Sequence, residues 1–84
     1  MPYIKQDTRK LLKVPGVKPM CAGDLNYKIH DLLNDYLFLK QESYQTYNDI
    51  IGVLECVKQE VYRRRIAPYE EIKLTQNGEV DFYK

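Results

Sequence analysis

Apolar residues recur at steps of three and four along two long stretches of the chain, which is the spacing of one face of a helix. The first stretch runs from Asp24 to about Lys40 and carries Leu25, Ile29, Leu32, Leu33 and Tyr36 on one face. Asp24 is predicted to cap this helix, because its carboxylate can accept hydrogen bonds from the free amides of the first turn. We expect the apolar face to be core, whereas Tyr27 and Phe38 lie on the opposite face and need other cover.

The second stretch begins after Ser43, a predicted N-cap, and extends to Arg65 or Ile66. Its apolar positions are Tyr44, Tyr47, Ile50, Ile51, Leu54, Val57, Val61 and Tyr62. With Val53 added, this sector covers about half of the helix circumference, which is wider than the ~100° stripe that docks on one neighbour. The link of residues 40–42 is short, so the two long helices are predicted to be antiparallel neighbours. The broad sector indicates contact with more than that neighbour.

The segments before the first long helix are short. Residues 1–5 carry a proline and the apolar pair Tyr3-Ile4, which favours a short extended arm or edge strand. Asp7 is predicted to cap a brief helix that ends at Pro15-Gly16. These segments together form a short N-terminal element.

Two structures compete for the C-terminal segment. Pro68 lacks an amide hydrogen, so the second long helix is predicted to stop or bend there. The Asn77-Gly78 pair, flanked by alternating apolar residues, favours a small β-hairpin in which Leu74 pairs with Val80 and Ile72 with Phe82. The alternative is a helix that starts at Pro68 and is capped at Gly78. We prefer the hairpin, so the predicted fold is one mainly α domain over residues 1–84.

Composition excludes several kinds of site and location. The 84 residues carry 13 basic and 12 acidic side chains, so no overall field attracts a polyanion. No run approaches the ~20 apolar residues of a membrane span, and the N-terminus lacks a secretory signal, so we expect a cytoplasmic protein. Cys21 and Cys56 are 35 positions apart and, with His30 alone, form no spaced zinc ligands. Free thiols and no metal or other cofactor are expected.

Several short stretches, in order, resemble an uncharacterised family of small phage and bacterial proteins of unknown function. They are Met1-Pro2-Tyr3-Ile4-Lys5, Gly23-Asp24-Leu25-Asn26-Tyr27, Tyr44-Gln45-Thr46-Tyr47-Asn48-Asp49, Tyr62-Arg63-Arg64, Pro68-Tyr69-Glu70 and Asn77-Gly78. The resemblance covers nearly the whole chain, although residues 13–22 have no match. It implies a small intracellular protein, phage or bacterial, and it implies no catalytic residue.

The run of three arginines, residues 63–65, is the first candidate site. At 100° per residue the three side chains fan over 200°, so one α-helix cannot aim them at one phosphate. Arg63 falls on the polar face and Arg64 can pair with Glu60, four residues back, so both are interpreted mainly as solvated. Arg65 projects along the apolar sector, as does Lys58. We hypothesise that Lys58, Arg65, Tyr62 and Tyr69 form an anion site at a subunit boundary, while the alternative is that these long chains only cover apolar surface.

Catalysis is not expected. His30 could act as a base if Asp31 or Asp35 oriented it, but the sequence has no activated nucleophile and no glycine-rich phosphate loop. The chain is therefore predicted not to be an enzyme.

Eight tyrosines in a chain of this size indicate an interface, since tyrosine combines apolar area with one polar group. We expect a homo-oligomer whose interface contains Tyr27, Phe38, Tyr47, Ile51 and Leu54. The predicted function is a non-enzymatic interaction module that binds a protein partner, such as a host protein, or an anionic ligand. The alternatives are a nucleotide-sequestering protein and a nucleic-acid-binding accessory protein.

Overall fold

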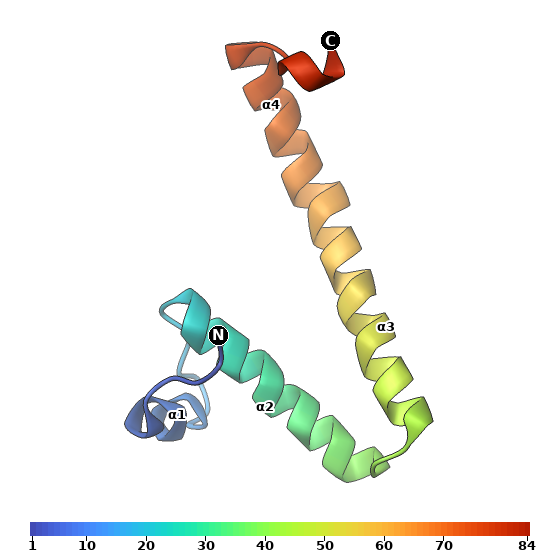
Figure 1. Ribbon diagram of the computed structural model, residues 1–84. Helices are drawn as coiled ribbons and strands as arrows, with labels where there is room; N and C mark the ends of the chain where they lie inside the picture. The colour runs from blue at the N-terminus through green and yellow to red at the C-terminus, as the bar shows by residue number, and fades with distance from the viewer. The chain divides into compact units, whose positions relative to one another are not determined.

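The computed structural model describes residues 1–84, and every regular element in it is helical (Figure 1). The elements are α1 (Gln6–Leu12), α2 (Ala22–Lys40), α3 (Tyr44–Val61), the π-helical turn η1 (Tyr62–Ile66), α4 (Ala67–Asn77) and the 3-10 turn η2 (Asp81–Tyr83). The chain forms two compact units, Met1–Tyr47 and Asn48–Lys84. That they act as one domain stays a prediction.

In the N-terminal unit, α1 packs against the start of α2. Leu12 is the one buried apolar residue, with 4% of its surface exposed. Two polar contacts tie α2 to the residues that follow α1: Lys13 Nζ lies 3.0 Å from Asp31 Oδ1, and Lys28 Nζ donates to the Val17 carbonyl at 2.7 Å. The hydrogen bond with Asp31 is the main cause that raises the pKa of Lys13. This unit therefore contains a small core of its own, tied by side chains at its rim.

The start of α2 differs from the prediction. The helix begins at Ala22, so Asp24 lies in its first turn and does not cap it as the flanking residue. Asp24 is buried and its Oδ2 accepts the Met20 amide at 3.1 Å, which anchors the preceding loop. Gly23 lies close to the N-terminal arm, because a Cβ atom there would come within 3.0 Å of the Ile4 side chain.

The apolar face of α2 that we expected to be core is largely exposed. Leu25 is 51% exposed and Leu32 is 70% exposed. Leu25, Ile29 and Leu32 line an open groove together with Leu12 of α1. Periodicity identified the helix and its apolar side, but α1 and the loop after it leave that side partly open.

The link to α3 confirms the predicted cap. Gln41 ends α2 with a positive φ of 69°, and its amide donates to the Leu37 carbonyl. The Thr46 amide then donates to Ser43 Oγ at 3.0 Å, which is the hydrogen bond of an N-cap serine. Thr46 is itself buried and its hydroxyl donates to the Gln41 carbonyl.

In the C-terminal unit the helix does not stop at Pro68, as Figure 1 shows for α3 and α4. A proline leaves the carbonyl four residues earlier without its usual partner, and its ring crowds that carbonyl. The π turn η1 directly precedes it, and the Ala67 amide donates to the Tyr62 carbonyl five residues back. Such a wide turn takes up one additional residue and lets the helix pass the proline.

The predicted hairpin is wrong. Residues 72–77 continue α4, and no strand occurs anywhere in the chain. Gly78 has a φ of 87° and its amide donates to the Leu74 carbonyl at 2.8 Å, so the Asn77-Gly78 signal marks the end of a helix. A two-stranded hairpin is only marginally stable by itself, whereas this segment extends a helix that is already formed.

The fold class is therefore corrected to a chain that is 75% helical and has no β-hairpin. The two long helices are present as α2 and α3, but their antiparallel packing is not confirmed.

Candidate functional site

The C-terminal unit carries an apolar stripe along α3 that is not buried. Ile50, Leu54, Val57 and Val61, called the α3 stripe below, alternate at steps of four and three. This is the spacing of the positions that meet a partner in helical bundles and coiled coils. Val57 is 56% exposed and Val61 is 48% exposed, and no residue from Asn48 to Lys84 is buried. The unit alone buries none of the four residues.

The residues predicted at an oligomer interface lie in different environments. Leu54 belongs to the α3 stripe and is half-buried, while Ile51 beside it and Phe38 on α2 are exposed. Tyr47 is 43% exposed, and desolvation, with a further contribution from the Glu42 carboxylate, raises its pKa.

Tyr27 has cover within its own chain. The Arg9 guanidinium lies 5.7 Å from the centre of the Tyr27 ring, a cation–π geometry, and Arg9 Nε also donates to the Ile4 carbonyl. This contact supplies part of the cover for which the sequence suggests a second subunit.

The three arginines are held differently from one another. Arg63 donates to both carboxylate oxygens of Glu60, at 3.0 and 3.2 Å, and Arg64 lies 4.0 Å from the same carboxylate. The side chain of Arg65 has no hydrogen bond or ion pair. All three lie in the π turn, where the 100° step used to project Arg65 along the apolar sector does not hold.

Two of the four residues predicted to bind an anion line one open groove. This Lys58 groove, about 620 Å³ in volume, is lined by Lys58, Gln59, Glu60, Tyr62, Arg63 and Ile66. Arg65 and Tyr69 are not among its lining residues. Instead, Lys73 Nζ lies 5.7 Å from the centre of the Tyr69 ring.

The cations of the Lys58 groove are already paired within the helix. Lys58 Nζ lies 3.4 Å from Glu55 Oε2. The hydrogen bond from Gln59 to Glu55, together with Lys58, holds the pKa of the Glu55 carboxyl below its ordinary value. Exposed ion pairs contribute little to stability because water screens them, so an incoming anion could replace the carboxylates at little cost.

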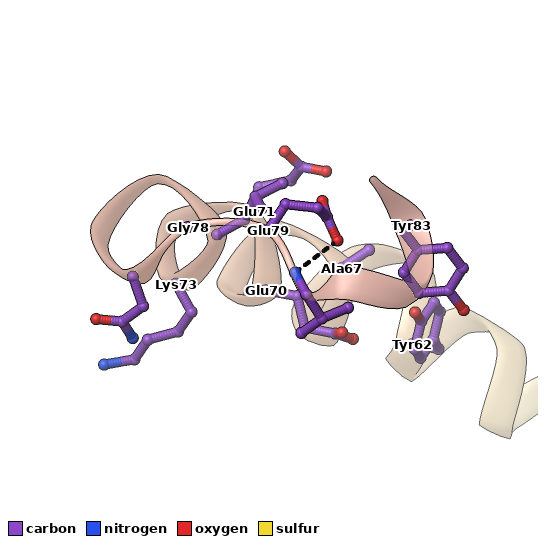
Figure 2. A pocket seen from close by; sticks show the side chains of 11 residues that line it. Tyr62, Ala67, Glu70, Glu71, Lys73, Gly78, Glu79 and Tyr83 are labelled. Atoms are coloured by element: carbon purple, nitrogen blue, oxygen red, sulfur yellow. Dashed lines mark hydrogen bonds between the residues drawn. The ribbon is translucent and has the colours of Figure 1, made fainter.

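A second groove, the C-terminal groove, lies where the last residues fold back over α4 (Figure 2). It has a volume of about 430 Å³ and its lining includes Tyr62, Glu70, Glu71, Glu79, Val80 and Tyr83. Tyr62 and Tyr83 lie together at one end of the groove in Figure 2. The Val80 amide donates to its neighbour's carboxylate, Glu79 Oε1, at 3.1 Å.

Tyr62 lines both grooves and its hydroxyl is hydrogen-bonded to Glu70. This hydrogen bond is the main cause that raises the pKa of the Tyr62 hydroxyl, and the charge of Glu70 acts in the same direction. The two residues are eight apart, so their contact joins the first residue of the π turn to α4.

Sequence reasoning missed the C-terminal groove because it assigned residues 72–83 to a hairpin. It also placed Arg63 only on the polar face, although the spacing of Lys58, Tyr62 and Arg63 at four and five residues matches one side of a helix containing a π turn. The proline at 68 was the available signal for such a turn.

The remaining candidate residues are His30, with its possible acidic partners, and the two cysteines. His30 Nδ1 is 2.9 Å from the Asn26 carbonyl oxygen, and Asp31, one of the two candidate partners of His30, pairs with Lys13. No three His, Cys, Asp or Glu side chains are grouped as a metal site requires. Cys21 and Cys56 are free and exposed.

No helix has the length and apolarity needed to cross a bilayer. In comparisons with known proteins, no curated protein and no solved structure matches the chain. One family model, described as a domain of unknown function (DUF6899), matches residues 1–80. Because that match covers nearly the whole sequence, the chain belongs to the DUF6899 family.

Proposed function

We propose that the protein is a non-enzymatic interaction module that self-associates through the α3 stripe. The observation that carries this proposal is the combination of regularly spaced apolar residues on α3 with a unit in which no residue is buried. Isolated helices are marginal in water, and most helical stability in proteins comes from packing an apolar face. A second copy supplies a matching face, since it carries the same stripe.

Sedimentation equilibrium over a range of concentrations tests the proposal. The mass is expected to rise above the 10.0 kDa of one chain as concentration increases. Leu54→Glu places a charge in the stripe and should leave the chain monomeric, whereas Asn48→Glu, on the polar side of the same helix, should not. A reducing agent is required, because both cysteines are exposed and a disulfide would imitate assembly. A wild-type chain that stays at one-chain mass throughout contradicts self-association.

A second candidate function is binding of an anionic ligand in the Lys58 groove. It is favoured by the groove that brings together Lys58, Tyr62 and Arg63, and it includes the nucleotide-sequestering and nucleic-acid-binding alternatives. Calorimetry with mono-, di- and cyclic nucleotides should show saturable heat that Lys58→Met and Arg63→Met remove and Lys10→Met retains. Binding of nucleic acid should weaken steeply with salt as counterions are released. Absence of heat with every nucleotide would rule out nucleotide binding, and absence of salt-dependent nucleic-acid binding would rule out the nucleic-acid alternative.

The resemblance noted in the sequence also supports a phage or bacterial source and a cytoplasmic location, the host cytoplasm if the protein is viral. A host protein is then the third class of partner. Affinity capture by the wild-type chain but not by Leu54→Glu would place such a partner on the α3 stripe.

A further inference from the structure

Nearly every charged side chain of the C-terminal unit has a partner within that unit. The partners are Glu55 for Lys58, Glu60 for Arg63 and Arg64, Asp81 for Lys84, the Tyr69 ring for Lys73, the Tyr62 hydroxyl for Glu70 and the Val80 amide for Glu79. Asp49 also has a partner. The exceptions are the guanidinium of Arg65 and the carboxylate of Glu71. The Thr75 hydroxyl donates to the backbone carbonyl of Glu71 and not to its carboxylate.

These two opposite charges do not neutralise each other within one chain. On a helix surface, residues three and four apart are neighbours, whereas Arg65 and Glu71 are six apart. Both residues are exposed, so each charge is available to an oppositely charged group of another molecule.

The surroundings of Glu71 suit a guanidinium. Glu71 lines the C-terminal groove together with Glu70 and Glu79, and the rings of Tyr62 and Tyr83 line it as well (Figure 2). A guanidinium can pair with a carboxylate through a planar fork and stack on an aromatic face. Lys73, the one cation in the lining, is directed to the Tyr69 ring.

The same unit also carries the complementary charges. Residues 58–66 contain four basic residues and one acidic residue, and residues 67–81 contain four acidic residues and one basic residue. In a two-fold dimer, if residue i contacts residue j of the partner, then j contacts i. Adjacent blocks of opposite charge on one surface are thus complementary to the same surface on a second copy. Ile66 and Tyr69, 42% and 60% exposed, provide apolar area between the blocks.

We propose that Arg65 of one copy docks in the C-terminal groove of a second copy, against Glu71, while the reciprocal contact forms on the other side of the two-fold axis. This inference rests on the proposed self-association and adds to it the charged contact that orients the two copies. The groove's occupant is thus a second copy of this chain rather than a basic segment of another protein.

Charge exchange provides the test. Arg65→Glu and Glu71→Arg, made singly, each place like charges together in both contacts and should weaken the dimer about tenfold or more at low salt. The double variant exchanges the two charges and should return the dissociation constant to near that of the wild type. Lys10→Glu, the matched control in α1 for Arg65→Glu, makes the same change in net charge as that variant and should have no such effect. Circular dichroism verifies that each variant is folded.

The outcomes separate the two proposals. A wild-type dimer whose dissociation constant is unchanged by both single variants overturns the Arg65–Glu71 contact and leaves self-association through the α3 stripe standing. Single variants that weaken the dimer without recovery in the double variant also overturn the pairing. A monomeric wild type contradicts both proposals.

Discussion

The two units of this chain solve the problem of helix stability in different ways. The N-terminal unit folds α1 onto α2, buries Leu12 and Asp24, and adds an ion pair between Lys13 and Asp31. In the C-terminal unit α3, η1 and α4 follow one another without a break, and no residue is buried. The difference teaches that helix length and regular apolar spacing do not create a core. A second packed surface does, and only the N-terminal unit contains one.

The largest expected effect tests the small core. Leu12→Ala should lower the free energy of unfolding by about 2 to 4 kcal/mol, because it removes a buried side chain and leaves a cavity. Leu11→Ala is the matched control: Leu11 is 57% exposed, so the change should stay within about 0.5 kcal/mol. Urea unfolding followed by circular dichroism measures both. Equal effects of the two variants would mean that the N-terminal unit has no specific core.

The buried carboxylate of the same unit comes next. Asp24→Ala removes the acceptor of the Met20 amide and should cost about 1 to 2 kcal/mol. Asp35→Ala, on the exposed side of α2, should change the unfolding free energy by less than about 0.5 kcal/mol. If Asp24→Ala is as mild as its control, the anchoring of the loop before α2 contributes nothing to the contrast between the units.

Hydrogen exchange on dilution should then distinguish the two units. If a second copy stabilises residues 48–77, their amide hydrogens should exchange about threefold faster for each tenfold dilution of a predominantly dimeric sample. The amides of α1 and of the first turns of α2 should exchange at rates independent of concentration. Hydrogen exchange read by mass spectrometry provides both rates in one experiment. Concentration-independent exchange in both units would remove the proposed distinction.

The smallest effect concerns the contact across the π turn. Because Glu70 raises the pKa of Tyr62, the neutral hydroxyl is favoured in the folded state. The stability from this contact is therefore complete below the ordinary tyrosine pKa of about 10 and is lost as pH rises through the higher folded value. Glu70→Gln should lower the pKa of Tyr62, and Glu71→Gln should leave it unchanged. Carbon-13 NMR of labelled tyrosine follows the titration, and an identical curve for all three proteins would contradict the contact.

Much of the helical content followed from sequence pattern. The steps of three and four placed both long helices, and Ser43 was identified as a cap because its position before an apolar-periodic stretch has few other roles. The candidate site was harder to predict from the sequence. Lys58 and Tyr62, which helical spacing groups together, both line the Lys58 groove, whereas the C-terminal groove depends on how the last residues fold back over α4.

The errors have local physical causes. Asn77-Gly78 permits a positive φ, which both a hairpin turn and a helix end require, so the dipeptide by itself does not distinguish them. The apolar face of α2 was expected to be core but stays partly open, since periodicity shows which side is apolar and not how fully a neighbour covers it. Arg65 was projected with an α-helical step through a segment whose turn is wider.

That wider turn and Pro68 together set the length of the chain at this point. A π turn holds one residue more than an α turn, so deleting one residue among Arg63, Arg64 and Arg65 and replacing Pro68 would convert it to an ordinary turn without moving the flanking helices out of alignment. Natural sequences that differ from this one by a single residue at the arginine run are therefore compatible with the same long helix, provided that they also lack the proline.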